Sequence, residues 1–280
     1  MNNIKCIVGV ILVSILLSCQ HKETRNLEKE IPKERTQIEM ITSKGTIKLA
    51  LYNETPQHRD NFIKIVKDGV LDSVLFHRVI NQFMIQAGDI KSKNADSTIT
   101  LGPNDLPYTV PAEINQKLYH KRGALGAARD GNPEKASSST QFYIVQRGPR
   151  QDSLIDLDQE RINGWLAEHY MQKDSLYSSL FEGRNAAIKE MDMDTYRIYA
   201  DSLRILSKDF TDYEKYVIPE DHREVYRTSG GTPHLDQNYT VFGEVLEGMH
   251  VVDSIAVTKT SDADRPVEDI RILSVKIIEK

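Results

Sequence analysis

The sequence predicts a mainly β domain that is interrupted by an α-helical insertion. Two segments, 37–42 and 46–52, alternate apolar and polar residues on either side of Ser43-Lys44-Gly45, which is the pattern of a β-hairpin. Between residues 150 and 228, apolar residues instead recur at helical spacing. With 39% apolar residues in a chain of 280, the protein can bury a full hydrophobic core.

A helix is expected directly after the first hairpin. Thr55 is a candidate N-cap, and Pro56 would occupy the first helical position. Gly69 is expected to end the helix. The apolar residues at helical spacing, which we expect to face the core, are Phe62, Ile63, Val66 and Val70.

The most informative stretch is FHRVINQFMIQAGD at residues 76–89. Two apolar, β-forming runs flank the polar pair Asn81-Gln82, so the stretch predicts two short strands joined by a tight turn. Arg78 lies in the middle of the first run, where a guanidinium group is costly unless it is paired or has a task. The residues alone leave two interpretations open. Arg78 either extends to water from an edge hairpin or belongs to a functional site.

Further strands follow along the chain. Residues 123–128 form a run of small residues, which in a strand lets another backbone approach closely. Residues 141–145 form a stronger strand candidate, in which Gln141 and Tyr143 are two apart and share one face. A strand at 239–245, a short helix at 248–255 and a final alternating strand at 271–278 complete the domain.

These motifs, in this order, resemble the cyclophilins, a family of peptidyl-prolyl cis/trans isomerases. Residues 76–89 match the family's Phe-His-Arg, Phe-Met-x-Gln and Gly-Asp signature, and residues 138–143 resemble its Gly-Ser-Gln-Phe-Phe. Residues 234–243 resemble its Trp-Leu-Asp-Gly and His-x-Val-Phe-Gly blocks. The resemblance covers about 37–149 and 229–280. It implies a closed eight-stranded antiparallel β-barrel capped by two helices, with an α-helical insertion.

The resemblance also implies an active site that needs no cofactor and no metal. It assigns catalytic roles to Arg78, Phe83 and Gln86, with Arg78 as the hydrogen-bond donor. The substrate-binding residues that it implies are Met84, Ala128, Arg129, Gln141, Phe142, Tyr143, His234, Leu235 and Tyr239. The positions that depart from the family's usual residues are Arg129 for Asn, Tyr143 for Phe, His234 for Trp and Tyr239 for His. Because the Trp is linked to cyclosporin affinity in the family, we expect weak cyclosporin binding.

The insertion, residues 150–228, predicts two or three amphipathic helices with Gly164, Gly183 and Pro219 as the main breaks. It is either a solvated decoration or a lid or partner-binding arm that selects substrates, and it could fold over the groove until a client displaces it. Two functions stay open as well. The first is an isomerase of X-Pro bonds in proline-containing polypeptides, acting in the folding of envelope proteins. The alternative is a binding or chaperone module with little catalysis that uses the insertion to hold partners.

The N-terminus predicts an export signal and a lipid anchor. Lys5 precedes an apolar run at 7–17, which is too short to span a bilayer. The run ends in Leu16-Leu17-Ser18-Cys19, which resembles the bacterial lipobox and implies cleavage before Cys19 and lipidation there. An ordinary secreted protein with a chance cysteine is the alternative.

The expected organisation is therefore a signal peptide at 1–18, a polar tether at 19–36 and a cyclophilin-like domain at 37–280, interrupted by the insertion at 150–228. The protein would be lipid-anchored in the bacterial cell envelope, facing the periplasm. Cys6 and Cys19 are the only cysteines, so the folded part has no disulfide framework. A net charge of -5 and a pI near 5.9 give no argument for nucleic-acid binding. The eight histidines show no metal-ligand spacing.

Overall fold

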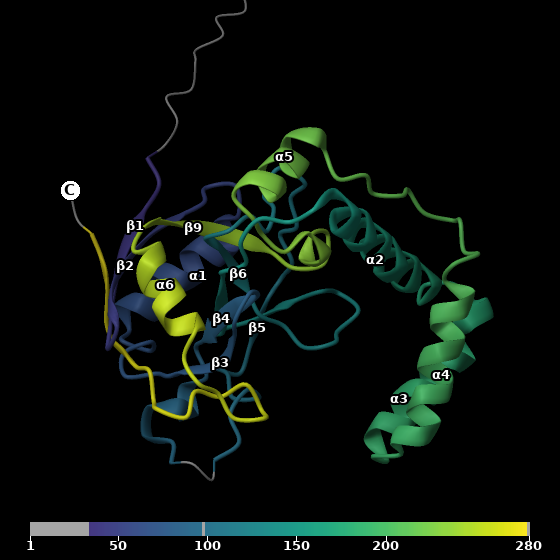
Figure 1. The fold of residues 1–280 in the computed structure, drawn as a ribbon. Helices are drawn as coiled ribbons and strands as arrows, with labels where there is room; N and C mark the ends of the chain where they lie inside the picture. Colours follow the sequence, from purple (N-terminus) through teal and green to yellow (C-terminus); the bar gives the residue numbers. More distant parts are fainter. Residues whose placement is uncertain (1–33, 97–98, 279–280) are drawn as a thin grey trace, which may run out of the picture. The chain divides into compact units, whose positions relative to one another are not determined.

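One antiparallel sheet of eight strands organises the computed structural model, which describes residues 34–96 and 99–278 (Figure 1). The predicted signal peptide, Cys19 and most of the tether lie outside the described residues. The strand order is β10-β1-β2-β9-β6-β8-β4-β3. Its strands are β1 (Gln37–Thr42), β2 (Gly45–Leu51), β3 (Phe76–Ile80), β4 (Met84–Ala87), β6 (Ala124–Ala127), β8 (Phe142–Val145), β9 (Val241–Glu247) and β10 (Ile272–Ile277). A separate short ladder joins β5 (Thr109–Val110) to β7 (Ser137–Ser138).

The two edges of the sheet, β10 and β3, meet but do not form a ladder. Ser73 and Phe76 donate backbone hydrogen bonds to Ile272 and Ile270, at 2.8 and 2.9 Å. Beyond that point, Val79 donates instead to the carbonyl of Asp264, in the irregular segment before β10. The mainly β, antiparallel fold is as predicted. The expected closure into a barrel is not confirmed, because the chain before β10 leaves strand geometry where β3 continues.

The core lies within the curl of this sheet. The predicted hairpin β1–β2 pairs Met40 with Ile47, and both side chains are fully buried. Helix α1 (Pro56–Lys67) inserts Phe62 between Phe142 and Phe242, with ring centroids 5.5 and 5.4 Å apart. Helix α6 (Met249–Ala256) packs its buried apolar residues on the same core. Burial of each such large apolar side chain contributes about 1.5–3 kcal/mol.

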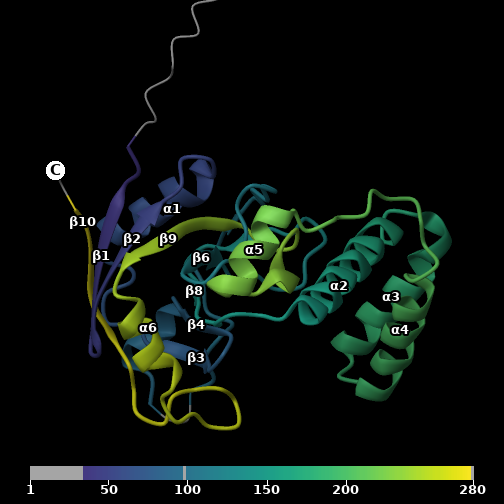
Figure 2. The same ribbon diagram turned by 45° about the horizontal axis from the view of Figure 1, so that its top comes forward.

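Residues 152–228, all of which the structure describes, contain four α-helices rather than the two or three expected. They are α2 (Asp152–Met171), α3 (Ser178–Lys189), α4 (Met193–Leu206) and α5 (Glu220–Thr228). Helices α3 and α4 lie side by side (Figure 2). Gly164 and Gly183 do not break helices as expected; a Cβ on Gly183 would lie 2.3 Å from the Tyr199 ring, so glycine here permits close helix packing. Pro219 precedes α5 as its N-cap.

Helices α2 and α5 pack against the sheet domain through a second apolar cluster. Ile155 and Ile162 of α2 and Tyr226 of α5 are its most buried members, and Tyr119, which precedes β6, packs against them. In the part of the chain that the structure describes, no helix is both long and apolar enough to cross a membrane.

The N-terminus of α1 is capped by a residue that the sequence did not indicate. Thr55 occupies the predicted N-cap position, but its hydroxyl has no hydrogen-bond partner among the described residues. The carboxylate of Glu113 instead accepts from the backbone N–H groups of Gln57 and His58, at 3.0 and 2.9 Å. It also contacts Nδ1 of His58 at 2.7 Å. A negative charge at a helix N-terminus is favourable, so Glu113 fastens the helix to the loop after β5.

This arrangement predicts unequal effects at two capping positions. Glu113→Gln removes the charge and one acceptor from the helix N-terminus and should lower the free energy of unfolding by about 1–2 kcal/mol. Thr55→Val keeps the shape of an unpaired side chain and should change it by less than about 0.5 kcal/mol. Urea denaturation of both variants is the measurement. A larger loss for the Thr55 variant would contradict the assignment.

Candidate active site

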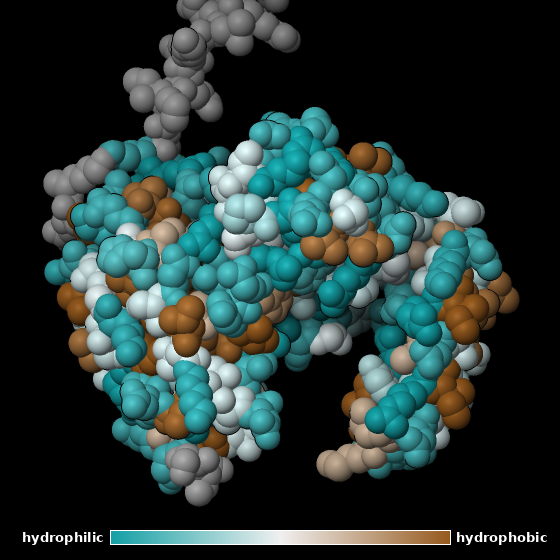
Figure 3. All heavy atoms as spheres, viewed as in Figure 1, coloured by the Kyte–Doolittle hydropathy of each residue, from teal (hydrophilic) through white to brown (hydrophobic). Residues whose placement is uncertain are grey.

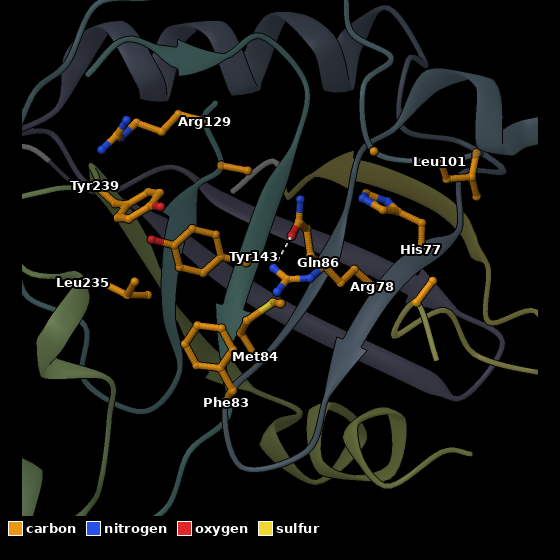
Figure 4. A pocket seen from close by; sticks show the side chains of 13 residues that line it. His77, Arg78, Phe83, Met84, Gln86, Leu101, Arg129, Tyr143, Leu235 and Tyr239 are labelled. Atoms are coloured by element: carbon orange, nitrogen blue, oxygen red, sulfur yellow. Dashed lines mark hydrogen bonds between the residues drawn. The ribbon is translucent and has the colours of Figure 1, made fainter. Parts of the chain in front are cut away.

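A pocket of about 250 Å³ opens where β3, β4 and β8 face the segment around η3 (Pro233–Leu235) (Figure 4). Of the residues implied from the sequence, it brings together Arg78, Phe83, Met84, Gln86, Ala128, Arg129, Tyr143, Leu235 and Tyr239. Two of these are cationic, and none of the described residues that line the pocket is acidic. The pocket therefore combines an apolar interior with two guanidinium groups at its wall.

Strand register places the central residues in one row. The β3–β4 ladder pairs Arg78 with Gln86, and the β4–β8 ladder pairs Gln86 with Tyr143. The β6–β8 ladder then pairs Tyr143 with Gly126. Paired residues of neighbouring strands lie on the same face of a sheet, so the row brings the guanidinium, the amide and the ring to one surface.

Arg78 is held only loosely by the protein. Its Nη1 lies 3.5 Å from Oε1 of Gln86, and its Nε lies 3.5 Å from the Asp264 carboxylate. Both distances are at the long end for hydrogen bonds. Gln86 is itself positioned, because its Nε2 donates to Oε1 of Gln141 at 3.2 Å. The guanidinium therefore has N–H groups left to donate to a ligand in the pocket. Gln86, which Gln141 holds in place, helps to orient it.

The apolar part of the pocket is formed by Phe83, Met84, Tyr143 and Leu235 (Figure 4). Gly126 makes room for the Tyr143 ring: a Cβ at that position would lie 2.3 Å from the ring. The sequence predicted that the small residues of β6 let another backbone approach closely. At Gly126 they make room for the Tyr143 side chain instead. Tyr239 meets Tyr143 edge-on, with centroids 6.1 Å apart, and closes the wall.

Three implied contact residues do not line this pocket. Phe142 alternates to the other face of β8 and packs in the core against Phe62, so its side chain lies away from the pocket, and its role in substrate binding stays a prediction. His234 stacks on Phe83, with centroids 5.5 Å apart, and supports the wall from outside. Burial and the nearby Arg161 lower the pKa of His234 to about 3, so its ring is neutral at pH 7. Gln141 lines an adjoining polar pocket of about 270 Å³.

The structure adds lining residues that sequence reasoning missed, namely His77, Leu101, Gly102 and Ala263. His77 is buried, and neither of its ring nitrogens has a hydrogen-bond partner within the described part of the chain. Burial lowers its pKa to about 4. The β3–β4 register shifts between Phe76 and Arg78, and this irregularity breaks the strict alternation at His77. No sequence pattern marks such a shift.

A buried polar network lies behind the pocket. The Tyr143 hydroxyl lies 2.8 Å from Nε2 of His120, and Nδ1 of His120 lies 2.7 Å from Oδ1 of Asp236. The Tyr226 hydroxyl donates to Oδ2 of Asp236 at 2.6 Å. Burial raises the pKa of Tyr143 well above its usual value, so its O–H donates to His120. The residues of this network come from segments that are far apart in the chain, which is why the sequence could not reveal it.

The network predicts a measurable cost for a conservative change. Tyr143→Phe keeps the ring but leaves Nε2 of His120 buried without a donor, which should lower the free energy of unfolding by about 1–3 kcal/mol. The matched control is Tyr170→Phe, because that ring is 41% exposed. Both are measured by urea denaturation. Equal effects of the two substitutions would argue against the network.

Comparison with known proteins finds similarity over most of the chain. Residues 37–170 and 224–277 match the family described as cyclophilin type peptidyl-prolyl cis-trans isomerase/CLD. A protein of Staphylococcus haemolyticus named "Putative peptidyl-prolyl cis-trans isomerase" is 28% identical over 255 residues, covering 91% of this chain and 97% of its own. The protein of the same name from Staphylococcus saprophyticus is 28% identical over 256 residues, covering 90% and 97%.

A solved structure shares the fold. The crystal structure of a Cryptosporidium parvum cyclophilin type peptidyl-prolyl cis-trans isomerase superposes with a TM-score of 0.51 at 17% identity, covering 88% of this chain and 99% of that one. Residues 171–223, between the two segments that match the family, contain α3 and α4. Among the residues that the structure describes, no group of three or more His, Cys, Asp or Glu is arranged to hold a metal ion.

Proposed function

The chain belongs to the cyclophilin-type peptidyl-prolyl cis-trans isomerase family, and we propose that it catalyses rotation about X-Pro bonds in the pocket beside Arg78. The observation that carries the proposal is the loosely held guanidinium next to an apolar pocket without acidic lining. This combination suits a neutral proline ring whose nitrogen becomes a hydrogen-bond acceptor during rotation.

The chemistry requires loss of amide resonance. Rotation about the C–N bond has a barrier of about 18–20 kcal/mol, and the uncatalysed reaction takes tens to hundreds of seconds. No covalent intermediate, proton transfer or redox step is needed. A catalyst lowers the barrier by binding the twisted amide better than the planar one, in which the nitrogen lone pair is delocalised.

The pocket residues divide these tasks. Phe83, Met84, Tyr143 and Leu235 would hold the proline ring, and their apolar surface excludes water. Arg78 would donate to the proline nitrogen as its lone pair localises, while Gln86 orients the guanidinium. Nε2 of Gln141 donates to the carbonyl of Gly102 at 2.6 Å. Gln141 would contact the backbone of the substrate beside Gly102. This is electrostatic preorganisation, in which donors point in advance to where charge develops.

The proposal predicts a large loss on removing the donor. Arg78→Ala should lower kcat/KM for an X-Pro peptide by about 10²–10³. Arg78→Lys should also be impaired, because a point charge lacks the planar set of donors. Stopped-flow isomerisation with a chromogenic peptide is the measurement. The matched control is Arg204→Ala, an exposed arginine on α4. Unchanged turnover in a folded Arg78→Ala variant would sink the assignment.

A second function, the holding of partner proteins with little catalysis, is favoured by one observation. Helices α3 and α4 expose large apolar side chains, among them Ile188, Met193 and Ile198, at 54%, 52% and 66% exposure (Figure 3). Exposed apolar surface of this kind is typical of interaction sites. The same peptide assay separates the two functions, because wild-type protein without turnover would leave only the binding function.

We propose in addition that the eight-stranded sheet closes into the barrel typical of the family. The backbone hydrogen bonds between residues 73–76 and 270–272, together with the bridge between Leu75 and Arg271, support this closure. Closure would extend these backbone hydrogen bonds along the remainder of β3 and β10, so that neither strand keeps an edge with unpaired backbone groups.

The place of action that we propose is the bacterial cell envelope, where the protein would assist the folding of proline-containing polypeptides. The support is the sequence of the N-terminus: the apolar run at 7–17, the lipobox-like ending at Cys19 and the polar tether up to residue 36. Several acyl chains on one cysteine would make a stable membrane anchor that faces the periplasm.

The anchor is tested by one substitution in the producing bacterium. Cys19→Ala should block lipidation and shift the protein from the membrane fraction to the soluble fraction, while isomerase activity stays the same because the site lies in the folded domain. Cell fractionation and mass spectrometry of the N-terminus are the measurements, with Cys6→Ala as the control within the predicted signal peptide. Membrane association without modification of Cys19 would contradict the proposal.

A further inference from the structure

A second cavity, of about 300 Å³, lies between the loop of residues 129–136 and helices α2 and α3; we call it the insert pocket. Resting on the proposed isomerase function, we propose that the insert pocket is a substrate subsite that binds the carboxylate side chain of an acidic residue near the X-Pro bond. The residues that carry the argument are Arg129, Lys135, Trp165, Glu168, His169 and Arg184.

The insert pocket adjoins the proline pocket. Arg129 lines both cavities, and its guanidinium lies 4.8 Å from the centre of the Tyr239 ring, which forms the wall of the proline pocket. Trp165 of α2 packs against the apolar cluster that contains Tyr143 and Leu235. A polypeptide with its proline in the first pocket can therefore pass Arg129 and place a neighbouring residue in the second.

The charge of the insert pocket is positive and only partly neutralised. Arg129 donates to the backbone and side-chain oxygens of Asn238, at 2.9 and 2.7 Å, and to the carbonyl of Asp130 at 2.9 Å. Nζ of Lys135 donates to the carbonyl of Gln237 at 2.8 Å. These acceptors are neutral, so the bonds fix both cations in place without cancelling their charge.

Within the described part of the chain, one of the cations lining the insert pocket forms an ion pair with an acidic side chain there. Arg184 lies 3.4 Å from the Glu168 carboxylate, and both side chains are partly buried. Glu134, in the 129–136 loop, is exposed, and its effect on the pKa of His169 is weaker than that of each nearby cation. The pocket thus holds more positive than negative charge, although the whole chain carries a net charge of -5.

Burial and the excess of positive charge lower the pKa values of two groups in the pocket. Burial, Arg129 and Lys173 lower the pKa of Lys135 to about 8. Burial, followed by Lys135, Lys173 and Arg129, lowers the pKa of His169 to about 4, so this ring is neutral at pH 7. A carboxylate in the pocket would relieve the repulsion among these cations and would accept charge-assisted hydrogen bonds from them.

The shape of the pocket suits an amino-acid side chain. Trp165 and the buried Phe181 provide apolar surface for the methylene groups of Glu or Asp, while Lys135 and Arg129 provide the charge. Trp165, His169 and Arg184 come from the insertion, and Arg129 and Lys135 come from the sheet domain. The subsite is therefore incomplete without helices α2 and α3, which gives the insertion a role in substrate selection.

The first test is a peptide series without tryptophan. One Glu is placed at successive positions on either side of a common X-Pro bond, and each peptide has a Gln counterpart. At one position the Glu peptide should show a kcat/KM about fivefold above its Gln counterpart at low salt, and this ratio should fall as salt screens the charges.

Matched variants localise the preference. Lys135→Gln combined with Arg184→Gln should bring the Glu/Gln ratio close to one. The control combines Lys189→Gln with Arg197→Gln, two exposed cations of α3 and α4 outside the pocket, and should keep the ratio. Lys135→Glu should also abolish the preference for Glu, whereas Lys135→Arg keeps the charge and should retain it.

Binding can be followed without catalysis, because Trp165 is the only tryptophan of the chain. Its fluorescence should change and saturate with the Glu peptide in wild type and in Arg78→Ala, but not with the paired Lys135 and Arg184 substitutions. The absence of any Glu preference and of this fluorescence change would overturn the subsite. Wild-type protein that shows the fluorescence change but no turnover would instead overturn the proposed isomerase function and leave the subsite standing.

Discussion

The buried carboxylate of Asp236 is the constraint on which the rest of the site depends. It is 2% exposed, and a charge so buried is stable only with full hydrogen bonding. His120 supplies its ring and its backbone N–H, at 2.7 and 2.9 Å, and Tyr226 supplies its hydroxyl at 2.6 Å. These donors come from the segment before β6 and from α5, so one carboxylate ties the sheet, the η3 segment and the insertion together.

The geometry of the proline pocket follows from this point. Because His120 is fixed by Asp236, it presents Nε2 to the Tyr143 hydroxyl, and the Tyr143 ring lies against Gly126. Gly231 allows the approach, since a Cβ there would lie 2.3 Å from the carbonyl of His120. Leu235 precedes Asp236 directly and is carried into the pocket by the same anchoring. Tyr143 and Leu235 are therefore held through Asp236, whereas the contacts of Arg78 are long and leave its guanidinium available to a substrate.

The insertion is built onto this scaffold rather than appended to it. Tyr226 of α5 binds Asp236, and Trp165 of α2 packs on the cluster of the proline pocket. Helices α3 and α4 lie between the two segments that match the family, and α3 brings Arg184 to the insert pocket. The parts of the insertion nearest to the sheet thus support the proline pocket, and helix α3 supplies a cation of the insert pocket.

The sequence by itself determined the mainly β class, the first hairpin, helix α1 and most of the pocket residues, because local alternation and a dense motif at 76–89 report directly on strands and on the family. It did not reveal the cap of α1 by Glu113, the irregularity at His77 or the network around Asp236. Each of these joins segments that are far apart in the chain, or depends on strand register, and neither leaves a periodic signal. The tertiary structure decided them, since burial makes a polar group find a partner wherever the fold brings one within reach.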